Sequence, residues 1–299
     1  MPNFAPAAGA SNDREDGQSA PPAPLGPHTV LLISRGTMSG AKPIAECLAE
    51  SGGMRCVTRE DLLTAINRYG GLATRIASRI VKAEQAYQEF SEVRRPYQIL
   101  MRRALLECAR QGPLAYLGYS GHLLLPRIAH FVRIRLIAPL EMRVSRTRQA
   151  LGYSEAEARD YIHRVDQERT HWARLMYGLD IRDPAGYDMC LNVERMSLRG
   201  ACDVLRGVRE QPDFQPTPES SAQEENEYLA TQALAALVTN PETLGLEIGA
   251  SAAGGVVRLV GPFLPDDQMR IVLSVADSVP GVQGIEYQPG YEPAFRYAS

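Results

Sequence analysis

Residues 29–42 read TVLLISRGTMSGAK, and the strand, loop and helix patterns within them are the main indication of the fold class. The apolar run at residues 30–33 is typical of a buried strand in a parallel sheet. A glycine-containing loop follows, and a helical pattern begins near residue 42. Such a loop presents backbone N–H groups and the helix dipole to an anion, so we predict an anion site here. Its candidate binding residues are Arg35, Gly36, Ser39, Gly40 and Lys42.

The spacing within this loop departs from a complete P-loop. That motif reads GxxxxGK[ST]; its lysine reaches the phosphates and its hydroxyl binds magnesium. Here Gly36 and Gly40 are four apart, and Lys42 is followed by Pro43 instead of serine or threonine. A plain turn between a strand and a helix would also use these glycines. The loop alone leaves both interpretations open.

Strand and helix patterns alternate as far as residue 209. The expected strands are 29–34, 114–117, 131–137 and 189–192, and the expected helices are about 42–50, 62–66, 72–91, 96–110, 154–176 and 197–209. Pro96 is expected to open one helix, and Ser154 with Glu157 has capping-box spacing at the start of another. The alternation predicts an α/β fold, a mostly parallel sheet flanked by helices, over residues 28–210. Residues 1–27, rich in Ala, Pro and Gly, are predicted to be a disordered tail.

A second, smaller unit is expected at the C-terminal end. Residues 211–224 are rich in proline and polar residues and are predicted to be a linker. The pattern that follows is α-β-β-α-β, with helices near 225–238 and 266–278 and strands near 246–251, 256–260 and 282–287. We therefore predict a small domain over 225–290, followed by a tail over 291–299.

The charges are unevenly distributed. The net charge is −3, but residues 210–299 carry 13 acidic and three basic residues, which leaves residues 1–209 with an excess of seven positive charges. A basic half suits an anionic ligand such as a nucleotide, whereas an acidic half disfavours nucleic acid and anionic lipid. The alternative explanation of the basic half is the composition of the genome, which can favour arginine; 30 of the 32 basic residues are arginine.

The compartment is predicted from what the sequence lacks. No apolar run approaches the ~18–20 residues of a membrane span, and the N-terminus has no signal-peptide pattern. The five cysteines are odd in number and widely spaced, which argues against a disulfide framework and a structural zinc site. We expect a cytoplasmic protein without a transmembrane segment.

Two helical segments carry arginines at a spacing that suits phosphate. Arg143 and Arg146 are three apart, as are Asp166 and Arg169, so each pair shares a helix face. Guanidinium groups supply the planar donors that phosphate accepts. A solvated face with weak ion pairs explains the same spacing, and both interpretations stay open.

Two other kinds of site are disfavoured. The sequence from Gly118 to His122 has histidine where a nucleophile elbow, GxSxG, needs its last glycine. His163 and His171 share one helix, but no carboxylate or cysteine completes metal-ligand spacing. We predict no serine hydrolase and no metal centre.

A family resemblance rests on residues spread along the first domain. They are Ile33-Ser34-Arg35, Ser39-Gly40, Ile44-Ala45, Leu48-Ala49-Glu50, Thr58-Arg59-Glu60, Gly118, Leu123-Leu124, Ala138-Pro139-Leu140-Glu141, Arg143, Arg146, Ser154-Glu155, Glu157-Ala158, Asp166, Arg169, Asp183, Tyr187-Asp188 and Asn192. In this order they resemble the cytidylate-kinase-like family, relatives of the P-loop nucleoside monophosphate kinases, over about residues 29–208.

The resemblance implies a P-loop kinase-like core that uses ATP and Mg²⁺ to phosphorylate a nucleoside monophosphate such as CMP. It implies that Arg143, Arg146 and Arg169 clamp the moving phosphoryl group and that Asp166 orients an arginine or a magnesium-bound water. Departures from the family pattern fall at the site, where Met38 crowds the loop and Tyr119 replaces an arginine. A competing hypothesis is therefore a catalytically silent nucleotide-sensing or scaffold protein.

The C-terminal segment resembles a BON domain through GVVRLVG at residues 255–261 and VPGVQGI at residues 279–285. That resemblance, with the acidity of the segment, implies a role in binding a protein partner or in self-association. It covers about residues 226–288.

Overall fold

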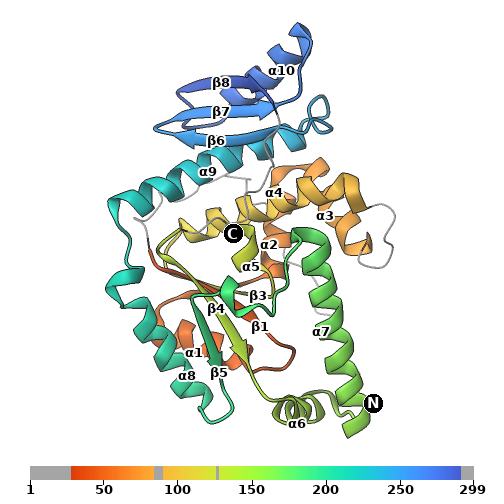
Figure 1. Cartoon of the computed structure of the whole chain (residues 1–299), viewed down its shortest axis with the longest axis vertical. Helices are drawn as coiled ribbons and strands as arrows, with labels where there is room; N and C mark the ends of the chain where they lie inside the picture. Colours follow the sequence, from red (N-terminus) through yellow and green to blue (C-terminus); the bar gives the residue numbers. More distant parts are fainter. Residues whose placement is uncertain (1–27, 84–89, 126–127, 291–299) are drawn as a thin grey trace, which may run out of the picture.

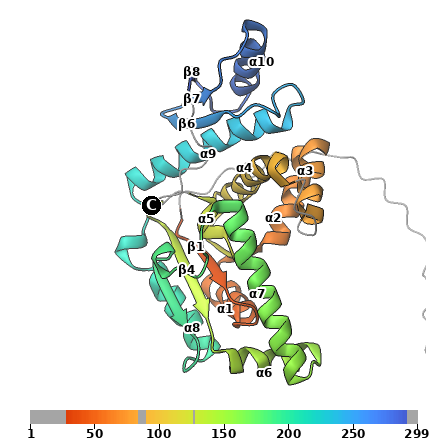
Figure 2. The same cartoon turned by 45° about the vertical axis from the view of Figure 1, so that its right-hand side comes forward.

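The computed structural model describes residues 28–83, 90–125 and 128–290. The tails expected at 1–27 and 291–299 lie outside the described residues. A larger α/β unit carries a smaller C-terminal unit at one end, and α6 (Leu140–Leu151) lies at the other end in both views (Figures 1 and 2). No helix among the described residues is long and apolar enough to cross a membrane.

A five-stranded, all-parallel sheet forms the centre of the larger unit, as the alternation of patterns predicted. Its strands are β1 (Val30–Arg35), β2 (Arg55–Thr58), β3 (Leu114–Gly118), β4 (Phe131–Ile137) and β5 (Met189–Asn192), in the order β2-β3-β1-β4-β5. The strand β1 is central, with Ile33 opposite Leu117 on one side and Ile134 on the other. The sequence did not predict β2, an edge strand of four residues.

Alternate residues of the strands enter two cores because helices cover both faces of the sheet. Leu31 and Ile33 pack toward α1 (Ala41–Gly52) and α8 (Leu198–Arg209). Val30 and Leu32 belong to the core on the opposite face. That face carries α2 (Arg59–Ile66), α3 (Gly71–Ala83), α4 (Phe90–Ala109), α5 (Gly121–Leu124) and α7 (Glu155–Tyr177). The predicted capping box of Ser154 and Glu157 begins α7.

The boundary of one helix and the state of two cysteines differ from expectation. The described part of helix α4 covers Phe90–Ala109, so Pro96 lies inside the helix, where buried neighbours such as Tyr97 and Leu100 hold it against the core. A disulfide joins Cys47 of α1 to Cys202 of α8 across a sequence separation of 155 residues. The two helices pack side by side on one face of the sheet, a proximity that cysteine spacing does not reveal.

The C-terminal unit has the expected α-β-β-α-β order. It consists of α9 (Pro218–Thr239), β6 (Gly249–Ala253), β7 (Val256–Gly261), α10 (Asp266–Asp277) and β8 (Gly284–Pro289). The strands form one mixed sheet in the order β6-β7-β8, in which β6 and β7 are antiparallel and β7 and β8 parallel.

Helix α9 lies between the two units and contributes to both cores (Figure 1). Leu229, Ala233 and Leu237 pack toward the small sheet, whereas Leu234 and Val238 belong to the core of the larger unit. The helix begins at Pro218, so the segment expected to be a linker at 211–224 contains a 3-10 turn (Pro212–Phe214) and the first turns of α9. Proline at the first helical turn favours this earlier start.

Candidate phosphate-binding site

The loop between β1 and α1 has two residues in the left-handed conformation. Gly40 has φ 95° and directly precedes α1, and Met38 has φ 59°. A side chain in this conformation is strained by roughly 1–2 kcal/mol, so Met38 occupies a position that suits glycine. The Ser39 hydroxyl donates a hydrogen bond of 2.9 Å to the Gly36 carbonyl and so fixes the turn internally.

The carboxylate of Asp166, on α7, is hydrogen-bonded to this loop. It accepts hydrogen bonds from the Thr37 backbone N–H, at 3.0 Å, and the Thr37 hydroxyl, at 2.7 Å, and an ion pair joins it to Arg143. Burial opposes ionisation, but the hydrogen bonds from Thr37 and Arg143 outweigh it and lower the pKa of Asp166. A negative group of the protein therefore binds where the loop would present donors to an anionic ligand.

Two predicted arginines of α6 lie directly on the loop. Arg143 Nε donates to the Thr37 carbonyl at 2.6 Å, and Arg146 Nη1 lies 3.5 Å from the Met38 carbonyl. A Cβ atom at Gly40 would lie 3.1 Å from Nη1 of Arg146, so this glycine permits the close approach. The helix pair α6–α7 thus brings its arginines to the first loop of the sheet.

Arg169 and Arg35 add two further cations. Arg169 Nη1 donates to the Thr37 hydroxyl at 3.0 Å, and its guanidinium lies 5.7 Å from the centre of the Tyr119 ring. Burial first, and then the positive charge of Arg35, lower the pKa of Arg169. An anion placed between these two guanidinium groups would relieve their repulsion.

Lys42 does not join this group. Its side chain is 89% exposed, and its ammonium lies 4.0 Å from Glu46 one helical turn along α1. In the P-loop pattern lysine directly follows the second glycine, and the residue after Gly40 is the buried Ala41. The positions that supply lysine and a magnesium-binding hydroxyl in that pattern are therefore Ala41 and Lys42.

The residues present do not fit a protein-held Mg²⁺. Position 42 offers an ammonium group instead of a hydroxyl, and the nearby Ser39 hydroxyl donates to a loop carbonyl. Within the described parts of the chain, no group of three His, Cys, Asp or Glu side chains could hold a metal ion. His163 of α7 contacts Gln167 at 2.8 Å on an exposed part of the helix.

A polar group that the sequence analysis did not assign to the site lies at the end of β1. The Ser34 hydroxyl donates to the Tyr119 carbonyl at 3.1 Å and accepts from Arg135, at 2.9 Å, and the Tyr187 hydroxyl, at 3.1 Å. Ser34 and Arg135 stand opposite each other on paired strands, a register that the separate strand patterns could not supply. This group fixes the segment after β3, where Tyr119 meets Arg169.

His122 lies beside this group and is not a general base. Only 6% of the residue is exposed, its Nδ1 has no hydrogen-bond partner among the described residues, and its ring stacks on Tyr187 at 4.3 Å. Burial, and to a smaller extent Arg133 and Arg135, lower the pKa of His122 to about 3. The neutral, buried imidazole is a packing group.

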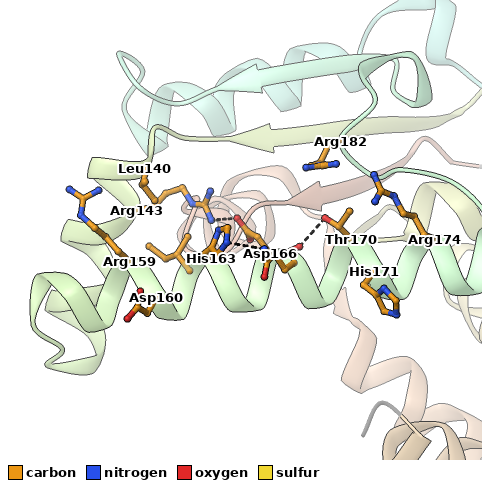
Figure 3. Close-up of a pocket in the computed structure, with 12 residues that line it drawn as sticks. Leu140, Arg143, Arg159, Asp160, His163, Asp166, Thr170, His171, Arg174 and Arg182 are labelled. Carbon is orange, nitrogen blue, oxygen red and sulfur yellow. Dashed lines mark hydrogen bonds and ion pairs between the residues drawn. The ribbon is translucent and has the colours of Figure 1, made fainter. Parts of the chain in front are cut away.

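A cavity of about 760 Å³ runs along α7 on the other side of Asp166 and Arg143 (Figure 3). The two residues line the cavity and also contact Thr37, so they form a wall between the cavity and the loop.

The larger unit is similar to known proteins. Residues 30–195 match the sequence profile of the cytidylate kinase-like family. A cytidylate kinase of Pyrococcus horikoshii is 24% identical over 200 residues, which cover 66% of this chain and 96% of that protein. The profile match ends before the C-terminal unit, so the resemblance of that unit to a BON domain has no support beyond its own residues.

Two solved structures are similar over the same share of the chain. An uncharacterized protein from Eubacterium ventriosum has a TM-score of 0.49 and 14% identity, over 62% of this chain and 99% of that one. A shikimate kinase from Bacteroides thetaiotaomicron has a TM-score of 0.37 and 12% identity, over 61% and 99%.

Proposed function

We propose that this chain, which belongs to the cytidylate kinase-like family, binds a nucleotide by its phosphate groups at the β1–α1 loop. The observation that carries the proposal is the convergence of Arg35, Arg143, Arg146 and Arg169 on this short loop. Arginine recognises phosphate with paired, charge-assisted hydrogen bonds. The family supplies ATP as the expected nucleotide.

Each group has a distinct part in this proposal. Arg35 and Arg169, whose charges repel, would bind the donor phosphates, while Arg143 and Arg146 lie over Thr37 and Met38, where a transferred phosphoryl group would pass. Asp166 would orient Arg143 through their ion pair. Phosphoryl transfer depends mainly on such positioning and on positive charge.

We propose that transfer of the ATP γ-phosphoryl group is slow or absent. Ala41 stands where a P-loop has lysine, and Lys42 points to solvent. The backbone N–H group of Thr37 already donates a hydrogen bond to Asp166. These features favour a catalytically silent nucleotide-sensing or scaffold protein. The rival function, phosphorylation of a nucleoside monophosphate such as CMP, is favoured by the arginine group around Asp166.

Calorimetric titration with ATP, CMP and a bisubstrate analogue, with and without Mg²⁺, tests the binding proposal. Arg169→Ala and Arg146→Ala should weaken nucleotide binding, whereas Arg148→Ala, an exposed residue on the same helix as Arg146, should not. A wild-type protein that binds none of the three would show that the loop is not a nucleotide site.

A coupled assay with each ribonucleoside and deoxyribonucleoside monophosphate tests catalysis. We expect turnover far below the ~1–100 s⁻¹ that is usual for kinases. If turnover is instead brisk and Arg146→Ala lowers it on the order of 10³-fold, the arginines clamp the phosphoryl group and the chain is an active kinase.

For the C-terminal unit we propose contact with a protein partner or a second copy of the chain, as its BON-like strands suggest. It is strongly acidic, and Phe263, which follows β7, is 89% exposed. Light scattering of the wild type and Phe263→Ser at low and high salt would test self-association. A monomer at every concentration would leave only the partner hypothesis.

A further inference from the structure

The strand β8 forms an open edge of the small sheet, which lies at the end of the molecule opposite α6 (Figure 1). Among the described residues β8 pairs with β7 alone, and no residue of β8 is buried, whereas Val257 and Leu259 of β7 are. The other outer strand, β6, lies against the larger unit, where Arg95 of α4 donates to the carbonyl of Ile248 directly before it. Within the described part of the chain, β8 is therefore the edge that a further strand can join.

The backbone groups on the outer side of β8 belong to alternate residues. The Gln283 N–H donates to the Gly255 carbonyl at 2.8 Å, and every second residue after it turns its N–H toward β7 in the same way. The residues between them turn their N–H and C=O groups outward; they are Gly284, Glu286 and Gln288. Pro289, which has no N–H, belongs to the inward set, so it does not block the outer edge as an edge proline usually does.

Two copies of β8 fit each other in an antiparallel register centred on Tyr287. With a two-fold axis at this residue, Glu286 stands opposite Gln288 of the second copy, and both have outward backbone groups, so each such pair can exchange two N–H···O=C bonds. A register centred on Glu286 would place two carboxylates opposite each other, which destabilises a sheet. A register centred on Ile285 would place Glu286 opposite Gly284, which has no side chain to contact it.

The side chains around this axis complement each other. Arg258 of β7 is in register with Glu286 and donates to the side-chain carbonyl of Gln288. The amide N–H groups of Gln288 can then donate to the Glu286 carboxylate of the second copy. The Tyr287 hydroxyl donates at 2.6 Å to the carbonyl just before Phe263, so this phenylalanine, which is 89% exposed, supplies apolar surface beside the strand.

We propose that β8 pairs with β8 of a second copy of the chain, antiparallel and centred on Tyr287, so that the two three-stranded sheets become one continuous sheet. The inference rests on the self-association proposed above for the C-terminal unit and names the strand that carries it. The pairing uses up the β8 edge of both copies, so the assembly stops at a dimer. Because strand pairing buries little area, the dimer should be weak and should depend on concentration.

The experiment is sedimentation equilibrium of the full chain at low and high salt, from about 1 µM to about 1 mM. The edge variant is Gln288→Glu, which keeps an acceptor for Arg258 and the outward N–H but sets a carboxylate opposite Glu286 of the second copy. The rescue variant combines it with Glu286→Lys and so places opposite charges across the axis. The matched control is Gln283→Glu, the same change at an exposed residue whose side chain lies against Gly255 in the turn between β6 and β7.

We expect the wild type to dimerise and Gln288→Glu to lower the association constant at least about fivefold, because the symmetry places the repulsion in the interface twice. High salt should reduce this loss, because it screens exposed charges. The rescue variant should associate at least as strongly as the wild type at low salt. Equal losses in Gln288→Glu and Gln283→Glu, or a rescue variant as weak as Gln288→Glu, would overturn the inference.

The inference and the proposed function fail separately. If the wild type self-associates, Phe263→Ser abolishes this and Gln288→Glu leaves it unchanged, the proposed self-association stands and the β8 pairing falls. If the wild type is a monomer at every concentration, the β8 pairing falls and contact with a protein partner remains as the proposed function.

Discussion

The charge of Asp166 should oppose phosphate binding at the loop, and its removal should strengthen binding. In Asp166→Asn the side chain keeps its size and can still accept from Thr37, but its negative charge is lost. Two unit charges about 4 Å apart interact by about 1 kcal/mol in water and about 4 kcal/mol near a protein surface. The affinity for tripolyphosphate should therefore rise at least about tenfold, which corresponds to about 1.4 kcal/mol.

The same substitution should lower stability. Hydrogen bonds to a charged group contribute about 1.5–3 kcal/mol in buried positions, and Asp166 accepts two from Thr37 and one from Arg143. Its side chain is 34% exposed, which reduces the effect, so we expect a loss of about 1–2 kcal/mol in the free energy of unfolding. The folded-state pKa of Asp166 is lowered, so the loss should be present above about pH 4 and fade as the pH falls below it.

Titration calorimetry and urea unfolding measure the two effects on the same samples. Glu168→Gln is the matched control because it removes one negative charge from an exposed position of the same helix. An affinity in Asp166→Asn that is unchanged, or lower than in Glu168→Gln, would show that the carboxylate does not compete with the ligand. A gain of affinity in both variants would show only a general effect of net charge.

Three further predictions concern the rest of the chain. Without reductant, the unfolded protein should show three reactive thiols, rising to five after reduction, because Cys47 and Cys202 are joined; five at the outset would contradict the disulfide. Between pH 7 and pH 5 the free energy of unfolding of the wild type should fall by about 2 kcal/mol relative to that of His122→Phe. The unfolded chain takes up a proton near pH 6.5, whereas the buried imidazole, with its pKa of about 3, stays neutral. Equal changes in the urea midpoints of the two proteins over this pH range would refute this. Arg95→Ala should cost about 1–3 kcal/mol in urea unfolding, because it removes the hydrogen bond of Arg95 to the Ile248 carbonyl and leaves the Leu246 carbonyl with the Ile248 N–H as its donor; an unchanged midpoint would contradict this role of Arg95.

The sheet was predictable because its signals are local. The run before the loop is apolar at every position, as a strand covered on both faces requires, and the capping box of Ser154 marks the start of α7 within four residues. The strand β2 has no such signal, since Arg55 is exposed and only Val57 of its four residues is buried. It forms a strand because it pairs with β3, and the residues of β2 alone do not show that this partner is available.

The site was predictable in part. Spacing placed Arg143 with Arg146, and Asp166 with Arg169, on shared helix faces, and the fold brings both faces to the loop. The prediction for Lys42 depended on where α1 begins. A shift of one residue turns a side chain by about 100° around a helix, so with Ala41 as the first residue of α1 the ammonium points to solvent.

Sequence patterns could not predict contacts between segments that lie far apart in the chain. The Cys47–Cys202 disulfide and the Ser34–Arg135 hydrogen bond each depend on which elements are neighbours in the sheet and its helix layers. The double role of α9 is of the same kind. A proline-rich segment before a helix looks like a linker, and only the position of Leu234 and Val238 in the core of the larger unit ties the helix to both units.

The β1–α1 loop already has a hydrogen-bond partner within the protein, and this limits how a ligand can gain affinity there. A buried N–H group needs an acceptor, and in the structure the carboxylate of Asp166 is the acceptor for Thr37. A phosphate that displaced it would gain nothing from the exchange of one oxygen anion for another at that N–H. Net affinity must come from groups outside the Asp166 contacts, and Arg169, which reaches the loop through the Thr37 hydroxyl, is such a group. The loop therefore depends on arginine charge for affinity where a complete P-loop relies on its lysine and free backbone donors.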